Sequence, residues 1–138
     1  MATFQLEFVS PEKLLLSRPV EMALLPAADG EMGVLPGHAP MIVGLRGGVI
    51  SVREGGAETE ALFVPGGFAE ITPTRVTVLA DEATPVAQLS RAEAEQRITE
   101  AEKALAALNA EGAAPEKREA AMARVLAARA MLAAAQSA

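Results

Sequence analysis

The sequence has 138 residues, a formal net charge of −6 and a pI near 4.8. Proteins that bind nucleic acid need a basic face, so this acidic balance argues against that class. The absence of cysteine excludes disulfide bonds, thiolate zinc sites and cysteine nucleophiles, and a single histidine excludes a multi-histidine metal site, whereas metal sites made of carboxylates alone remain open. The length suits one medium-sized domain, or one domain with an appended segment.

The composition of the chain changes near Val86. Ten of the eleven glycines and eight of the nine prolines lie at or before this residue, whereas residues 87–138 are rich in alanine. The charge divides at the same place, with five basic and eleven acidic residues up to Val86 and seven of each afterwards. We therefore expect two structural units, an N-terminal domain over residues 1–86 and a C-terminal unit over residues 87–138.

The first unit has the pattern of short β-strands. Phe4, Leu6 and Phe8 alternate with polar residues, as expected for a strand with one buried face. Pro19 restricts its own segment to a sheet edge or a bulge, and Gly55-Gly56 forms a predicted hairpin turn. Further strands are expected in residues 14–25, 49–53, 60–64 and 75–80. The pattern predicts an all-β sandwich of about eight to ten strands, in an antiparallel sandwich or flattened barrel.

The second unit has the pattern of two helices. Ser90 and Glu93 form a capping box, which predicts a helix start at Ser90. Gly112 is a predicted C-terminal stop, and Pro115 suits the first turn of a second helix that runs to about residue 135. Each helix has one apolar stripe, made of Ala94, Ile98, Ala101, Leu105 and Leu108 in the first and of Ala121, Val125, Ala128, Leu132 and Ala135 in the second. The short connection predicts an antiparallel two-helix hairpin.

The packing between the two predicted helices should be weak. Their facing stripes consist mostly of alanine, and a buried methyl group contributes only roughly 0.8 kcal/mol. Alanine is nevertheless the strongest helix former, so the helices can persist when their mutual packing is lost. We therefore hypothesise that the hairpin has two states, one folded and one extended or docked elsewhere.

The sequence lacks signs of catalysis and of membrane insertion. The N-terminus does not resemble a signal peptide, no apolar run approaches the ~20 residues that a transmembrane helix needs, and a cytoplasmic setting is the default. His38 is the one general base near neutral pH, and it lies in a predicted tight turn. A carbohydrate-binding or hydrolytic β-sandwich would need surface aromatics or paired carboxylates, whereas core packing explains the four phenylalanines. The residues alone thus predict a binding or structural module, without a metal ion or other cofactor.

Three segments carry a resemblance to a known family. The first is Gly-Glu-Met-Gly-Val-Leu-Pro-Gly-His-Ala-Pro at residues 30–40, which resembles the most characteristic loop of the epsilon subunits of F-type ATP synthases. Residues 64–70 followed by residues 76–81 resemble a second signature of that family. Ser90-Arg-Ala-Glu stands where the family's C-terminal hairpin begins. The similarity runs in order over essentially the whole chain.

The resemblance implies a fold and a role. The family's fold is a β-sandwich followed by a helical hairpin, in agreement with the prediction from the residues. The implied role is that of a non-catalytic rotor subunit, which joins the gamma subunit to the ring of c subunits at the cytoplasmic face of the bacterial inner membrane. It would be peripheral to the membrane, without direct insertion. The implied contacts with gamma and the c ring are Glu31, Gly33, Leu35, Pro36, Gly37, His38 and Pro40.

The resemblance also implies a regulatory hairpin. In this family the hairpin can extend beside gamma, reach the alpha and beta subunits and restrain ATP hydrolysis. The residues here that would make those inhibitory contacts are the basic residues of the second helix, Lys117, Arg118, Arg124 and Arg129. At 100° per residue they form two rows on the helix, with Lys117 beside Arg124 and Arg118 beside Arg129. Charges that only solubilise the helix would give the same pattern.

An alternative function is ATP sensing by the hairpin. Some members of the family bind ATP through an aliphatic-Asp-x-x-Arg-Ala motif, an upstream glutamate and arginines of the second helix. The matching residues here are Glu82, Arg91, Ala92 and Arg124. The sequence departs from the motif because Gln88 stands at the aspartate position and Ala87 at the aliphatic position.

Overall fold

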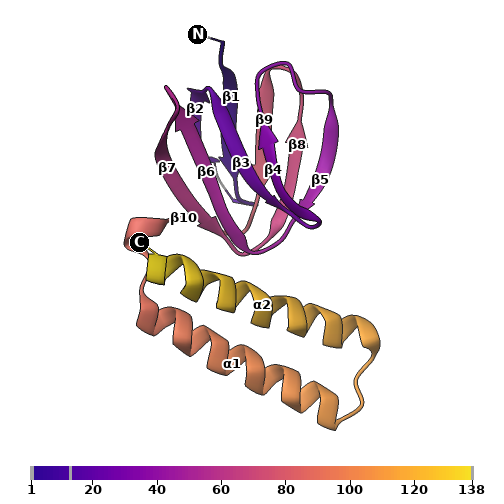
Figure 1. Cartoon of the computed structure of the whole chain (residues 1–138). Coiled ribbons are helices and arrows are strands. Elements are labelled where there is room, and N and C mark those ends of the chain that lie inside the picture. Colours follow the sequence, from indigo (N-terminus) through magenta and orange to yellow (C-terminus); the bar gives the residue numbers. More distant parts are fainter. Residues whose placement is uncertain (1, 13, 138) are drawn as a thin grey trace.

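The computed structural model describes residues 2–12 and 14–137, so residues 1, 13 and 138 of the two predicted units lie outside the description. Strands fill the first part and helices the second (Figure 1). The strands are β1 (Phe4–Val9), β2 (Leu14–Val20), β3 (Met22–Ala27), β4 (Gly30–Val34), β5 (Met41–Leu45), β6 (Gly48–Glu54), β7 (Ala57–Val64), β8 (Gly67–Ile71), β9 (Arg75–Leu79) and β10 (Thr84–Pro85). A 3₁₀ turn, η1 (Val86–Gln88), leads into α1 (Arg91–Ala110) and α2 (Pro115–Ser137). The predicted boundary after residue 86 falls within η1.

The strands form one curled sheet that packs on itself as a sandwich. One layer has the order β10-β7-β6-β3-β4 and the other β5-β8-β9-β1-β2, and the two are joined where Ala27 pairs with Leu45. The ten strands found in the described residues confirm the predicted sandwich. The expectation of purely antiparallel pairing is wrong at one place, because β1 runs parallel to β9. Most of the sandwich separates these two strands in sequence, so no tight turn forces them to run in opposite directions.

The core of the sandwich follows the period-two pattern of its strands. Phe4, Leu6 and Phe8 of β1 are buried and point between the layers, as predicted. Pro19 lies on β2, which is the edge strand of its layer, so its missing N–H interrupts no ladder on that side. The predicted turn at Gly55-Gly56 joins β6 to β7, with φ values of 62° and 80° that glycine adopts without strain.

The helix ends occur where the sequence places them. The Ser90 hydroxyl accepts a hydrogen bond from the Glu93 backbone N–H at 3.1 Å and caps α1. At the other end, the backbone N–H groups of Gly112 and Ala113 bond to the carbonyls of Asn109 and Leu108, which is a Schellman motif with Gly112 at a φ of 67°. Pro115 is the first residue of α2. The predicted antiparallel helical hairpin is therefore confirmed.

The hairpin lies across one end of the sandwich. In Figure 1, α2 runs between the sandwich and α1, and its C-terminal end lies near η1. The facing helix sides are lined by small residues, since Ala94 and Ala101 of α1 and Ala121 and Ala128 of α2 are buried. α2 thus has two neighbours, α1 on one side and the strand ends of the sandwich on the other.

Candidate functional site

One compact apolar cluster holds the hairpin on the sandwich. Phe63 of β7 packs with Ala94 of α1 and with Met131 and Ala134 of α2, and all four side chains are at most 7% exposed. Val49, Leu89, Ala130 and Leu132 pack around them. Because this cluster joins the beginning of α1, the end of α2 and the sandwich, we call these four residues the anchor cluster.

Sequence reasoning missed the anchor cluster. The expectation that all four phenylalanines belong to the sandwich core is wrong for Phe63, which faces the hairpin, and for Phe68, which is 59% exposed. A signal for Phe63 was present in the unbroken apolar run of residues 61–64. Alternation predicts one buried face, whereas a continuous apolar run is typical of a strand covered on both faces.

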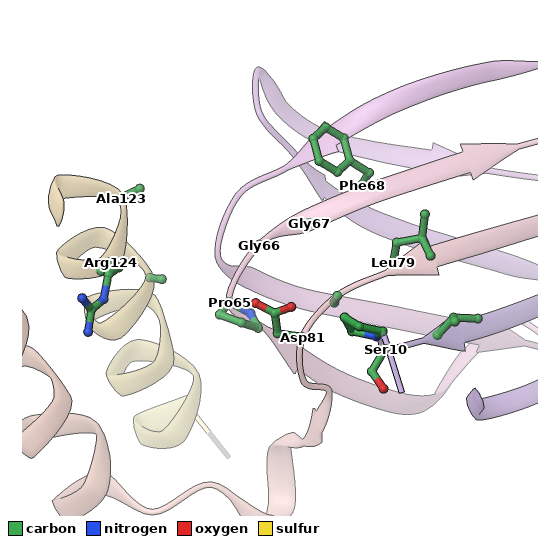
Figure 2. Close-up of a pocket in the computed structure, with 13 residues that line it drawn as sticks. Ser10, Pro65, Gly66, Gly67, Phe68, Leu79, Asp81, Ala123 and Arg124 are labelled. Atoms are coloured by element: carbon green, nitrogen blue, oxygen red, sulfur yellow. The ribbon is translucent and has the colours of Figure 1, made fainter. Parts of the chain in front are cut away.

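Beyond the anchor cluster, α2 and the sandwich touch only in part. Grooves of about 530 Å³ and about 870 Å³ run between α2 and the 65–67 turn of the sandwich. Figure 2 shows the first of these grooves, with Ala123 and Arg124 on the helix side and Pro65 on the sandwich side. A third cavity of about 320 Å³ lies between α2, α1 and Phe63. The docked hairpin is therefore well packed at the anchor cluster, whereas grooves border the middle of α2.

The outer face of the β5-β8-β9 layer carries exposed apolar side chains next to the carboxylate of Glu70. Ile42, Phe68 and Leu79 are 72%, 59% and 47% exposed, and Phe68 pairs directly with Leu79 across β8 and β9. Both side chains project from the same side of the sheet (Figure 2). Leu126 of α2 is 55% exposed and lines one groove together with Phe68. We call these four residues the outer apolar face, a surface of the kind that marks a protein interface.

The predicted loop over residues 31–40 is only partly a loop. Residues 31–34 belong to β4, where Glu31 pairs with Pro26, so the expectation of a continuous loop is wrong for them. Val34 points into the core and Met32 packs against it, an alternation that was readable in the sequence. The strand separates Glu31, which lines a groove facing α2, from the rest of the segment, which lies at the opposite end of the sandwich.

The remaining part of that segment is a tight turn whose residues are exposed or half-buried. Gly37 has a φ of 84°, and its N–H donates to the Pro73 carbonyl of the neighbouring turn at 2.8 Å. His38 Nδ1 lies 2.7 Å from the Ala39 carbonyl oxygen. Leu35 is 56% exposed, Pro40 is exposed and Pro36 is half-buried. Gly33 lies on β4, where an added Cβ would meet the Met22 side chain at 3.1 Å.

An ion-pair network joins the connection between β9 and β10 to the first helix. Arg97 of α1 donates to Glu82 at 2.6 Å and to Glu93 at 3.0 Å. The hydrogen bond with Glu82 holds the pKa of Arg97 above its ordinary value despite partial burial, so the guanidinium remains charged. The pair of Glu93 with Arg97 is the favourable (i, i+4) ion pair that their spacing in the sequence predicts. The network thus adds a polar contact between α1 and the sandwich to the apolar contact of the anchor cluster.

The four basic residues of α2 lie in different surroundings. Lys117 and Arg118 are exposed in its first turn. Arg124 lines the groove of Figure 2 and the 320 Å³ cavity. Arg129 donates to Glu102 of α1 at 2.8 Å. In the docked hairpin these cations thus do not form one continuous surface.

The predicted nucleotide-binding residues also lie in different places on the structure. Glu82 is engaged by Arg97, and Arg91 and Ala92 are exposed in the first turn of α1. Arg124 lies on the second helix, where the cavity that it shares with Arg97 is lined by neither Arg91 nor Ala92. The structure therefore does not bring all four residues to one described cavity.

Comparisons with known proteins define the class. Residues 3–86 match the family model described as "ATP synthase, Delta/Epsilon chain, beta-sandwich domain". The ATP synthase epsilon chain of Granulibacter bethesdensis is 58% identical over 134 residues, covering 94% of this chain and 99% of that one. The epsilon chain of Rhodospirillum rubrum is 47% identical over 125 residues, covering 91% of each. The chain belongs to the family of bacterial ATP synthase epsilon chains, as the resemblance implied.

A comparison of structures agrees with the fold. A chain in the mitochondrial ATP synthase of Euglena gracilis, a structure of OSCP, F1 and the c-ring, superposes with a TM-score of 0.74 at 23% identity. The match covers 97% of this chain and 82% of that chain. As an epsilon chain, this protein is a non-catalytic subunit of an ATP synthase complex, as expected. Among the described residues, no helix is both long enough and apolar enough to span a membrane.

Proposed function

We propose that this epsilon chain is a central-stalk subunit that couples the gamma subunit to the c ring and restrains ATP hydrolysis with its hairpin. The outer apolar face carries the proposal. A chain with a well-filled core leaves Ile42, Phe68, Leu79 and Leu126 exposed at one side of the sandwich and on the helix beside it. Burial of such a patch contributes roughly 25 cal/mol per Å² of apolar area, so a partner surface stabilises it.

The outer apolar face is the surface that we assign to gamma. It includes residues of both the sandwich and α2, so a partner seated there would contact the docked hairpin as well. The predicted interface residues Glu31, Gly33, Leu35, Pro36, Gly37, His38 and Pro40 remain proposed contacts with gamma and the c ring. Since Glu31 lies on β4 and His38 in the turn at the opposite end of the sandwich, we assign them to two different contacts. Through these contacts the chain would sit at the cytoplasmic face of the bacterial inner membrane.

The first prediction concerns Phe68. Phe68→Asp should weaken association of the chain with the purified complex at least tenfold, because it places a charge in a buried apolar interface. Phe68 is exposed in the free chain, so the thermal midpoint should stay within a few degrees of the unchanged chain. Co-sedimentation with the epsilon-depleted complex measures the affinity.

The matched control for Phe68 is Met122. Its side chain is 44% exposed on α2, in a shallow groove that it shares with Leu105 and Pro115 and with no residue of the outer apolar face. Met122→Asp should bind like the unchanged chain. Equal affinities of the Phe68 and Met122 variants would show that the outer apolar face is not the surface that binds gamma.

The hairpin has the properties of a movable element. Its buried apolar contact with the sandwich is the anchor cluster, and its helices are built from strong helix formers that persist without tertiary contacts. When extended, α2 would present Lys117, Arg118, Arg124 and Arg129 to the alpha and beta subunits. The Arg129–Glu102 ion pair would break on extension, at a cost of no more than about 1 kcal/mol for an exposed pair.

The second prediction tests whether the hairpin restrains ATP hydrolysis, a role that we call the brake. Removal of residues 87–138 should raise ATP hydrolysis by the assembled complex several-fold, since no helix remains to enter the catalytic subunits. The comparison is made at matched epsilon occupancy, determined from the band intensities of the purified complexes. An unchanged hydrolysis rate with full occupancy would show that this hairpin is not the brake.

ATP sensing is the second candidate function. It rests on the cavity that Arg97 and Arg124 line together, because two guanidinium groups can bind phosphate oxygens. Arg97 already pairs with Glu82 and Glu93, so ATP would have to compete with two carboxylates. Calorimetric titration of the chain with ATP distinguishes the two functions.

A further inference from the structure

Gly47 is the point at which the sandwich comes closest to α2. A Cβ placed on Gly47 would lie 2.8 Å from the Ala127 Cα and 3.0 Å from the Ala127 Cβ. It would also lie 3.3 Å from the Pro65 carbonyl oxygen. The φ of Gly47 is not in the left-handed region, so the backbone conformation does not require glycine here. What requires glycine is the space that α2 occupies.

The turn that carries Gly47 cannot easily move away from the helix. The N–H of Arg46 donates to the Pro26 carbonyl at 2.9 Å, which ties the turn to β3. On the other side, a Cβ on Gly48 would lie 2.8 Å from the Pro26 Cβ, so the backbone already packs tightly against that proline. A side chain at position 47 would therefore displace α2 and not the turn.

The surroundings of this contact make it decisive for docking. The 530 Å³ and 870 Å³ grooves both border Ala123, Ala127 and the 65–67 turn, so little other contact holds the middle of α2. A helix held away at Ala127 would also pull Met131, one turn further along, from Phe63 of the anchor cluster. Packed interfaces of this kind switch between discrete arrangements because they do not stretch gradually.

We propose that Gly47 is the docking point of the hairpin. Because it has no side chain, α2 can lie against it, and this sets the fraction of molecules in which the hairpin is docked. The inference rests on the proposed movement of the hairpin and names the residue that adjusts it. When the hairpin leaves, the contacts of a side chain at position 47 with Ala127 are lost, and the 3.3 Å approach to the Pro65 carbonyl oxygen remains. A substitution there thus acts mainly on the docked side of the equilibrium.

The test compares Gly47→Val with Gly44→Val in the full-length chain. Gly44 is also a glycine outside the left-handed region, and an added Cβ there meets nothing within 4 Å. Amide exchange in the middle of α2 should accelerate about tenfold to a hundredfold in Gly47→Val, the range expected for overpacking of a tight contact. It should stay unchanged in Gly44→Val. Exchange in β1 and β9 should be unchanged in both variants.

Two results would overturn the proposal. One is equal α2 exchange in the Gly47 and Gly44 variants. The other is faster exchange in β1 and β9 together with α2 in Gly47→Val, which would mean that the whole chain is destabilised.

A disulfide variant separates this proposal from the proposed brake. The natural chain has no cysteine, so Gly47→Cys with Ala127→Cys can form one disulfide only. The two Cβ atoms would start 3.0 Å apart, and the displacement of α2 by the new side chain opens this distance toward the roughly 3.5–4.5 Å of a disulfide. Oxidation should slow α2 exchange below that of the unchanged chain, and failure to crosslink would overturn the close approach. If exchange responds but ATP hydrolysis in the complex does not, Gly47 remains the docking point, and the proposal that the hairpin restrains ATP hydrolysis is wrong.

Discussion

Phe63→Ala is expected to release the hairpin while the sandwich stays folded. Phe63 is 1% exposed under the helices and lies outside the sandwich core, so its loss removes contacts that only the docked state makes. Truncation of a buried phenylalanine typically costs about 3–5 kcal/mol. The loss should appear almost entirely as a lower opening free energy of α2, measured by native-state amide exchange of residues 121–135 against β1 and β9.

Phe68 provides the control for Phe63. It is a phenylalanine on the next strand, 59% exposed, with no place in either buried cluster. Phe68→Ala should change the exchange of α2 and of the sandwich by less than about 0.5 kcal/mol. If the Phe63 and Phe68 variants open equally, or if Phe63→Ala unfolds the sandwich as a whole, the anchor cluster does not hold the hairpin as described.

Gly67→Ala is expected to destabilise the sandwich itself. Gly67 has a φ of 132°, a conformation that side chains rarely adopt, and a Cβ there would overlap the carbonyl oxygen of Leu79 on β9. Both groups are backbone atoms of paired strands, since β8 lies between β5 and β9. The strain and the displaced ladder should together cost more than about 3 kcal/mol. Urea unfolding, followed by circular dichroism, should show a lower midpoint.

Gly44→Ala is the matched substitution for this strand pair. Gly44 of β5 pairs with Phe68, the residue that follows Gly67. An added Cβ on Gly44 would meet nothing within 4 Å, and its φ lies outside the left-handed region. Its replacement should be neutral or slightly stabilising, because alanine loses less chain entropy on folding than glycine. A similar fall in the urea midpoint for both variants would contradict the steric account of Gly67.

Local patterns in the sequence were sufficient for most of the fold. The alternation in β1, the glycine pair between β6 and β7, the Ser90 cap and the Gly112 stop each depend on neighbours within a few residues. Such features follow from backbone sterics and from hydrogen bonds over a short stretch of chain. For this reason the strand count, the hairpin and the helix ends were predictable. The parallel β1–β9 pair was not, because it joins the two ends of the sandwich sequence.

The candidate site was less predictable for the same physical reason. Residues 30–40 look like one segment in the sequence, yet an extended strand of five residues covers roughly 15 Å and carries Glu31 and His38 to opposite ends of the sandwich. Phe63 was assigned to the core because alternation says which residues share a face, but not what covers the other face. Gly47 gave no signal, since its requirement is set by Ala127, eighty residues away.

The sequence by itself determined that an acidic, cysteine-free β-sandwich precedes an alanine-rich helical hairpin, and that its segments resemble an epsilon subunit. Composition, periodicity and capping are local properties of the chain, so no tertiary contact is needed to read them. Only the tertiary structure decided how the hairpin sits on the sandwich, through Phe63 and Gly47, and which apolar side chains remain for a partner. Those outcomes depend on close packing between distant residues, which is specified by shape in three dimensions.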